Sequence, residues 1–282
     1  VRVLTVRESQ SVIPVRDASL IDEIPECVTI HRSNLVDPYD NVLYRLILGA
    51  HRVLKSITGR LKGRRSAAAE PLSGTHGRKP NLDFIHSLMV PDRAVGWLPF
   101  AVIAGIKMIR QRRPSLLYST SPCETAHLAA LTLAWLYRIP LVTDFRDPWT
   151  EYYFGLQRPR SFDALNKALE RKVLARSSLV VTTADECSAS LYRIYPKDGR
   201  SKFITITNGY DESDFSGVEP FEFDRFTLIF TGTVYRQVTP ENIFKALKRL
   251  MKDNPDMSET LQFVFVGNQF DGFDEIVAKY NL

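Results

Sequence analysis

The sequence predicts an α/β protein with a doubly wound parallel sheet, followed by the beginning of a second unit of the same class. Short β-branched runs alternate with longer segments of helical periodicity, which is typical of βαβ units. The alternation stops near residue 210, a stretch of turn residues and acids follows, and it restarts near residue 226. At roughly 150 residues per domain, a chain of 282 residues suggests about two domains. We expect an N-terminal domain over 1–210, a linker over 211–225 and the start of a C-terminal domain over 226–282.

The strands of the first domain are predicted at Val1–Val6, Val28–His31, Leu116–Ser119, Leu141–Phe145, Leu179–Thr183 and Phe203–Thr207. Its helices are predicted at Val42–Leu61, Trp97–Gln111, Thr125–Tyr137, Phe162–Ala175 and Asp185–Tyr195. In the second domain we expect strands at Thr227–Thr231 and Gln262–Val266, with helices at Pro240–Met251 and Asp274–Tyr280. Thr239 before Pro240 is a helix start signal. The stretch from Arg60 to Pro80 is typical of a loop.

Composition narrows the classes of function. The net charge of +5 and pI of about 9.1 favour an anionic partner such as a phosphorylated substrate, nucleic acid or an acidic membrane. Cys27, Cys123 and Cys187 are too scattered for a disulfide framework or zinc site and fit a reducing cytosol. The dinucleotide-binding, P-loop and nucleophile-elbow fingerprints and a D-x-D metal clamp are absent. The longest uncharged apolar run, 94–106, is too short to span a bilayer.

The segment Ile139–Glu151 carries the most chemistry. A strand predicted to end at Phe145 leads into Arg146, Asp147 and Trp149, directly after Asp144. Ligands of open parallel sheets bind outside the carboxyl ends of the strands. Arg146 and Asp147 could form a charge pair, and Trp149 offers a flat face for a sugar ring. An ion pair and a packed Trp that only hold a loop explain the same residues equally well.

Three weaker signals follow other predicted strands. The run Ser119–Glu124 opens a helix, whose N-terminus suits a phosphate, although plain capping by Ser121 is the simpler interpretation. The pair Asn208-Gly209 is a turn signal first and a site second. Gly232, beside Thr233, would let a backbone approach a diphosphate closely.

These motifs occur in a characteristic order. They are Ser121-Pro122-Cys123, Ile139-Pro140 through Arg146-Asp147-Pro148-Trp149-Thr150-Glu151, Val180–Thr183, Thr207-Asn208-Gly209-Tyr210-Asp211 with Phe215, Ile229-Phe230-Thr231-Gly232, and Val266-Gly267. In this order they resemble glycosyltransferase family 4-like enzymes, and among them the sugar transferases of bacterial surface-polysaccharide synthesis. The resemblance covers most of the chain.

The resemblance implies a GT-B fold, in which two Rossmann-like domains face each other across a cleft. The first domain would bind a saccharide acceptor, which the resemblance implies is lipid-linked, and the second a nucleotide-sugar donor, with no metal or other cofactor. It implies catalytic roles for Asp147 and Arg146, acceptor binding by Trp149, Ser121, Asp144 and Glu151, and donor binding by Gly232, Thr233, Asn208 and Gly209.

Two departures from the family pattern bear on activity. The Gly-rich first loop is missing, and no two Glu residues lie eight positions apart as the family's donor motif requires. Because the chain also opens on Val1 within a strand pattern, we interpret both ends as cut and expect this piece alone to be inactive. A nucleotide-sugar epimerase of the same architecture and a non-catalytic sugar- or nucleotide-binding relative remain alternatives. Net charge alone favours nucleic acid, and no nucleic-acid motif is present.

A basic amphipathic helix is predicted over 42–65. Its apolar residues recur at helical spacing, and its Lys and Arg residues are accompanied by no acid between Asn41 and Ala69. Such a helix can lie in the interface of an anionic membrane. Packing of the apolar face on the domain is the alternative. We therefore expect a cytoplasmic protein that binds peripherally at the inner face of the membrane.

Overall fold

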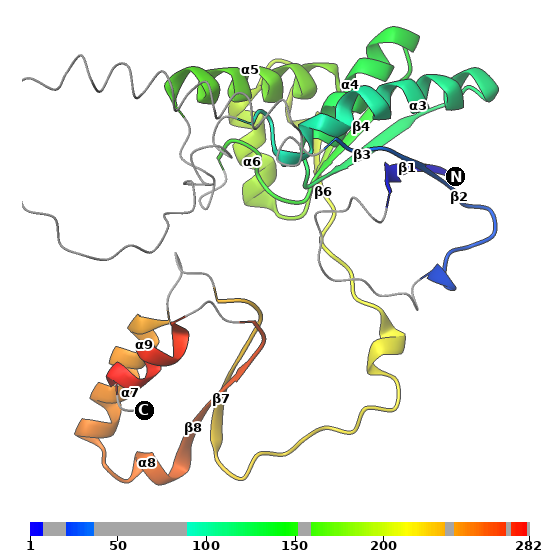
Figure 1. Ribbon diagram of the computed structural model, residues 1–282. Helices are drawn as coiled ribbons and strands as arrows, with labels where there is room; N and C mark the ends of the chain where they lie inside the picture. The colour runs from blue at the N-terminus through cyan, green and yellow to red at the C-terminus, as the bar shows by residue number, and fades with distance from the viewer. Residues whose placement is uncertain (8–20, 37–88, 152–158, 235–239, 269–271, 281–282) are drawn as a thin grey trace, which may run out of the picture. The chain divides into compact units, whose positions relative to one another are not determined.

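The computed structural model describes residues 1–7, 21–36, 89–151, 159–234, 240–268 and 272–280 (Figure 1). The chain divides into two compact units, Val1–Asn208 and Gly209–Leu282. The helix predicted over Val42–Leu61 and the loop predicted from Arg60 to Pro80 lie outside the described residues.

A parallel sheet organises the first unit. Its strands β3 (Leu117–Ser121), β4 (Leu141–Phe145), β5 (Leu179–Thr182) and β6 (Phe203–Thr205) are neighbours in chain order. A separate parallel pair is formed by β1 (Arg2–Val6) and β2 (Thr29–Ser33). The predicted α/β class with Rossmann-like parallel sheets is therefore confirmed, and β4 has the bounds that the sequence predicts.

The helices of the first unit connect successive strands. They are η3 (Arg93–Trp97), α3 (Leu98–Gln111), α4 (Thr125–Tyr137), α5 (Arg160–Arg176), α6 (Asp185–Ile194) and η4 (Arg200–Lys202). In Figure 1, α3, α4 and α5 lie together above the strands. Helix α4 packs against both α3 and α5 and is apolar on nearly every side. At Gly105 on α3 a Cβ atom would lie 2.4 Å from Leu133 Cδ1, so a larger residue there would displace the Leu133 side chain.

Three arginines bind the carbonyl groups at the carboxyl ends of α3 and α4. Arg2 on β1 donates to the carbonyl oxygen of Met108 at 2.7 Å and also to that of Arg112. Arg113 donates to Tyr137 O at 2.7 Å. Arg176, the last residue of α5, donates to Ala134 O at 2.7 Å and Ile139 O at 3.0 Å. These bonds bring the carboxyl ends of α3, α4 and α5 together, and each positive charge is favourable there.

The main core lies between the sheet and its helices. Its buried residues come from α4, β4, the loop after β4, α5, β5, α6 and β6: Leu128, Phe145, Trp149, Val173, Leu174, Val180, Leu191 and Phe203. His127 on α4 is also fully buried, with its ring centroid 4.5 Å from that of Phe145. Burial lowers the pKa of His127 to about 3, so the ring is neutral, and its Nδ1 shares a 2.8 Å hydrogen bond with Ser119 Oγ.

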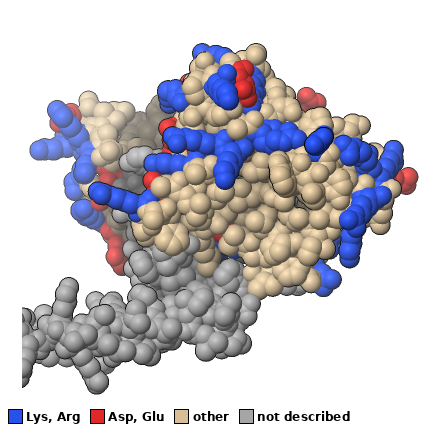
Figure 2. Space-filling model, turned by 90° about the horizontal axis from the view of Figure 1, so that it is seen from above, with Lys and Arg blue, Asp and Glu red and all other residues tan. Residues whose placement is uncertain are grey.

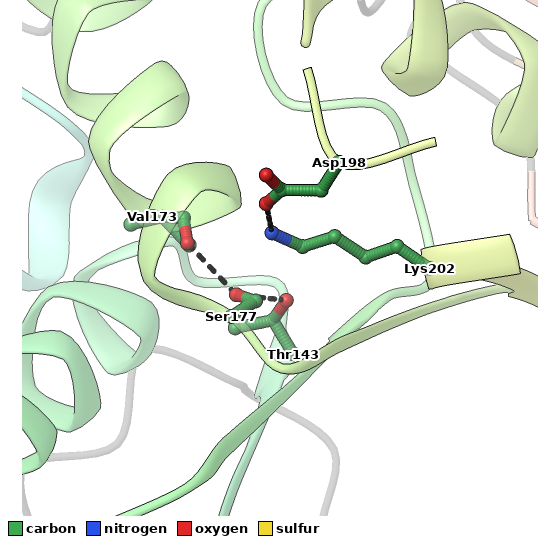
Figure 3. A network of polar contacts seen from close by, with 5 residues as sticks. All are labelled: Thr143, Val173, Ser177, Asp198 and Lys202. Atoms are coloured by element: carbon green, nitrogen blue, oxygen red, sulfur yellow. Dashed lines mark hydrogen bonds and ion pairs between the residues drawn. The ribbon is translucent and has the colours of Figure 1, made fainter. Parts of the chain in front are cut away.

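Buried polar groups near α5 and β6 are paired (Figure 3). Thr143 Oγ1 on β4 and Ser177 Oγ share a hydrogen bond of 2.9 Å, and Ser177 Oγ donates to Val173 O at 2.8 Å. The buried ammonium of Lys202 reaches Asp198 at 2.6 Å. These contacts offset the cost of removing the polar groups from water.

The second unit has one parallel strand pair, β7 (Phe226–Thr231) and β8 (Leu261–Val266), with helices η5 (Glu212–Phe215), α7 (Glu241–Asp253), α8 (Met257–Thr260) and α9 (Phe273–Tyr280). Phe244 and Leu247 on α7 pack with Phe273 and Tyr280 on α9. The predicted restart of the strand and helix pattern is therefore observed.

Candidate functional site

The carboxyl ends of β3, β4 and β5 meet at one edge of the sheet. Ser121 pairs in register with Phe145, and Phe145 pairs with Thr182. The segment 146–151 leaves β4 at this edge, as the sequence predicts. In an open parallel sheet this edge is where ligands bind.

Helix α5 holds the middle of that segment through two buried side chains. Trp149 Nε1 donates to Asn166 Oδ1 at 2.9 Å. The backbone N–H of Thr150 donates to Glu170 Oε1 at 3.2 Å, and the Thr150 hydroxyl contacts Glu170 Oε2. Asn166 and Glu170 are spaced i, i+4 and therefore lie on one face of α5. The segment is fixed by side-chain bonds although it has no regular secondary structure.

The two ends of the segment are anchored by other elements. Thr183, which follows β5, donates from Oγ1 to Arg146 O at 3.0 Å. The hydroxyl of Ser190 on α6 donates to Glu151 Oε2. Together with the three bonds to α5, these contacts define what we call the clamped loop, residues 146–151.

The clamped loop leaves the side chains of Arg146 and Asp147 exposed. Within the described residues they do not form the ion pair that the sequence suggested. The pKa of the Cys187 thiol on α6 is raised to about 11. The largest cause is burial, and the charges of the Asp147, Glu170 and Glu151 carboxylates add to it. The Asp147 side chain is thus open to a ligand, on a backbone that Thr183 holds at the neighbouring Arg146.

Trp149, predicted to stack on a sugar, is buried in this structure. Its side chain is 7% exposed and belongs to the main core. Its indole N–H is bonded internally to Asn166. Turning the indole outward would expose its buried apolar surface to water and break its hydrogen bond to Asn166. Trp149 therefore supports the clamped loop by packing in the core.

The predictions for Ser121 also need correction. Ser121 is 1% exposed and its hydroxyl is buried, so it is closed to an acceptor and does not cap α4. Asp92 fills that position instead, accepting from Thr125 N at 2.7 Å and Thr125 Oγ1 at 2.9 Å. It also accepts from Ala94 N at 2.6 Å at the start of η3. Because a carboxylate already occupies the first turn of α4, a phosphate there would meet charge repulsion.

Asp144 lies on β4 with its side chain tied to β3. Its Oδ2 accepts from Tyr118 OH at 2.8 Å and Thr120 Oγ1 at 2.9 Å. Burial and the contact with Asp144 raise the pKa of Tyr118 to about 12. The predicted acceptor-binding role of Asp144 would have to use the part of its carboxylate that these bonds leave open.

The residues predicted to bind the donor belong to the unit boundary and to the second unit. Asn208 ends the first unit and Gly209 begins the second, both exposed. Gly232 and Thr233 follow β7 in the second unit, where Gly232 N donates to Val266 O at 2.9 Å. Gly232 has a φ of 137°, which favours glycine.

Sequence reasoning missed the side chains that hold the loop. Asn166, Glu170 and Ser190 carry no motif of their own, Thr183 enters only as the end of a strand motif, and Asp92 lies far from α4 in the sequence. One signal was available: Asn166 and Glu170 are polar residues on the apolar face of a predicted helix. A polar pair at i, i+4 on such a face requires buried partners.

Glu170 gives a pH test of the clamp. Burial raises the pKa of Glu170 above its ordinary value of 4.5, although the bonds from Thr150 oppose the rise. The folded state therefore binds more protons than the unfolded chain above pH 4.5, and stability is lost as the pH rises through the folded pKa. Glu170→Gln keeps the shape and cannot titrate. We expect its stability relative to the wild type to increase from pH 4.5 toward neutrality.

Urea unfolding across this pH range measures the difference. Glu186→Gln, which changes an exposed carboxyl on α6, is the matched control and should follow the wild type. A Glu170→Gln variant that loses stability relative to the wild type as the pH rises would show that the carboxylate form holds the loop.

In the ranges that the structure describes, no group of three or more His, Cys, Asp or Glu side chains is arranged to hold a metal ion. No helix in the same ranges has both the length and the apolar character needed to cross a bilayer.

Several solved structures resemble the chain distantly. They include an MnaA–UDP co-structure from S. aureus (12% identity, 99% of this chain and 65% of that one, TM-score 0.41). Anabaena HepE in complex with UDP-glucose (18%, 64% and 46%, TM-score 0.37) is another. A third is a UDP-forming α,α-trehalose-phosphate synthase from Burkholderia vietnamiensis (11%, 66% and 46%, TM-score 0.41). The chain spans about half to two thirds of the length of these structures.

No curated protein matches the sequence significantly. The family model of the glycosyl transferase 4-like domain matches residues 63–204, which is half of the chain. The match contains β3, β4 and β5, the helices between them and the whole clamped loop. The chain therefore belongs to the glycosyl transferase 4-like domain family.

Proposed function

We propose that this chain is part of a glycosyltransferase that moves a sugar from a nucleotide-sugar donor to a saccharide acceptor in polysaccharide synthesis. The observation that carries the proposal is the clamped loop, which presents the exposed carboxylate of Asp147 on a fixed backbone at the ligand-binding edge of the sheet. Membership of the glycosyl transferase 4-like family supports the reaction class.

In this proposal Asp147 is the general base. An acceptor hydroxyl attacks the anomeric carbon of the donor, its proton passes to the Asp147 carboxylate, and the bond to the diphosphate oxygen breaks with its electrons on the diphosphate. Arg146 supplies a positive charge beside the reacting groups, which favours a departing anion. Glu151 and Asp144 are proposed to bind the acceptor, and Asn208, Gly209, Gly232 and Thr233 the donor. No metal or other cofactor enters these steps as we propose them.

The test is a transfer assay on the protein that is expressed from the coding sequence of this chain together with the coding sequence that flanks it. Incubation with a nucleotide sugar and a lipid-linked acceptor should give a glycosylated acceptor and free nucleoside diphosphate. Conversion of the nucleotide sugar without an acceptor would indicate an epimerase. Binding of either ligand without any product would indicate a non-catalytic relative. We propose that the reaction takes place in the cytoplasm, at the inner face of the membrane.

We expect the 282-residue chain alone to bind nucleotide sugars weakly and to lack transfer activity. The reason is that it contains no pair of Glu residues at the spacing of the family's donor motif. Calorimetric titration with UDP and GDP sugars should show no saturable binding up to about 1 mM ligand. A dissociation constant of about 1 mM corresponds to a binding free energy of about 4 kcal/mol. Micromolar affinity for a nucleotide sugar would mean that the donor site lies within these 282 residues.

A further inference from the structure

The carboxyl ends of α3, α4 and α5 form a basic surface. Arg110 and Arg112 end α3, Arg138 follows α4, and Lys172 lies one turn before the end of α5. All four side chains are exposed. The hydrogen bonds of Arg113 and Arg176 to the end of α4 show that these helix ends lie together.

Acidic side chains are scarce on this part of the molecule. Between residues 98 and 143 the only acid is Glu124, which lies at the opposite end of α4. On α5, Asp163 pairs with Lys167 near the start of the helix, and Glu170 is buried. Seen from above, this side of the molecule shows many Lys and Arg side chains and few acids (Figure 2). In the ranges that the structure describes, Arg110, Arg138 and Lys172 have no ion pair.

Neutralising the helix dipoles does not account for these charges. The carbonyl groups at the ends of α3 and α4 are already bound by Arg2, Arg113 and Arg176. Arg110, Arg138 and Lys172 therefore add positive charge beyond what the helix ends need. Like charges held close together repel one another, so a basic cluster of this kind is suited to an anionic partner.

Exposed apolar side chains lie among the basic ones. Trp135 is 72% exposed and Leu136 is 49% exposed, both on the last turn of α4. Trp135 directly follows Ala134, whose carbonyl accepts from Arg176, so it lies on the last turn of α4, which the end of α5 approaches. An exposed Trp on a helix end that is followed by Arg138 matches the interface of a lipid bilayer, where indole rings lie at the level of the headgroups.

We propose that this helix-end surface, formed by Arg110, Arg112, Trp135, Leu136, Arg138 and Lys172, docks on an anionic phospholipid membrane. Trp135 and Leu136 enter the interface, and the basic side chains contact the phosphates of the headgroups. The surface lies at the carboxyl ends of the helices and is separate from the clamped loop at the carboxyl ends of the strands. Docking requires no donor, acceptor or transfer, so its test is independent of the proposed function.

The test is co-sedimentation of the chain with vesicles of phosphatidylcholine alone or mixed in equal parts with phosphatidylglycerol. Binding should require phosphatidylglycerol and weaken with salt. The combined variant Arg110→Gln, Arg138→Gln, Lys172→Gln should bind at least about tenfold more weakly, because each basic side chain near an acidic surface adds to binding. The control Lys245→Gln, Lys248→Gln, Lys252→Gln removes the same charge from exposed positions on α7 and should bind like the wild type.

Tryptophan fluorescence gives a second readout. The chain has three Trp residues; Trp149 is buried, and Trp97 is half-buried and bonded to Ser33 Oγ at 2.7 Å. A blue shift on acidic vesicles should therefore come from Trp135 and disappear in Trp135→Phe. Equal binding of both triple variants, binding to neutral vesicles, or loss of binding only when Arg60, Lys62, Arg64 and Arg65 become Gln would overturn the proposal. Binding of RNA or heparin without vesicle binding would also overturn it and would point to a different polyanion.

Discussion

Asp147→Asn is expected to lower the rate of sugar transfer at least about a hundredfold, as for a positioned acid–base group. The amide keeps the size and polarity of the side chain but cannot take a proton from an acceptor hydroxyl. Thermal stability should stay nearly constant, because the side chain is exposed and outside the bonds that hold the clamped loop. Steady-state transfer by the protein with its flanking sequence, together with a thermal melt, measures both effects.

The matched control is Asp253→Asn at the end of α7. This carboxylate is also exposed, and its ion pair with Arg249 Nε is long, at 3.8 Å. Its transfer rate should equal that of the wild type. The transfer rate of Arg146→Gln should lie between those of Asp147→Asn and Asp253→Asn if the Arg146 charge assists the departing diphosphate. Near-normal transfer by Asp147→Asn would remove Asp147 from the catalytic step, and a large loss of stability would assign it a structural role.

Trp149→Ala is expected to destabilise the first unit by about 3 to 5 kcal/mol, the cost of truncating a buried aromatic side chain. The substitution empties part of the core and leaves Asn166 Oδ1 without its donor. Trp149→Phe should be milder, since it loses the hydrogen bond but keeps most of the buried ring. Urea unfolding followed by circular dichroism measures these changes in the free energy of unfolding.

The control is Trp135→Ala, which removes the same side chain from a site that is 72% exposed. Its effect should stay within about 0.5 kcal/mol, as for most surface substitutions. If both Trp variants were equally stable and Trp149→Ala instead raised the KM for the acceptor, Trp149 would be a ligand-binding residue after all.

The contrast between these two residues shows what the sequence can and cannot predict. The sequence predicts β4 and α4 with their observed bounds, because a short run with β-branched residues and a long apolar run depend on local chain geometry. It also places Arg146 and Asp147 at the carboxyl end of a strand. It cannot tell which tryptophan is buried, because that depends on whether a polar partner such as Asn166, far along the chain, meets the indole N–H.

The cap of α4 was missed for a similar reason. Ser121 has the residue type and position of a local cap, and Asp92 lies more than a helix length away in sequence. Asp92 caps the helix because its carboxylate accepts hydrogen bonds from both the backbone N–H and the hydroxyl of Thr125. A charged acceptor is also favoured at a helix N-terminus. Contacts between distant segments are set by tertiary packing, which a single sequence does not display.

The clamped loop also has a consequence for the order in which the protein is made. Each residue that fixes residues 146–151 lies later in the chain, at Asn166, Glu170, Thr183 and Ser190. During synthesis from the N-terminus, the residues of β3 and β4 are therefore made before any of these partners. The clamped loop can have its full set of bonds only once the chain extends to Ser190 on α6.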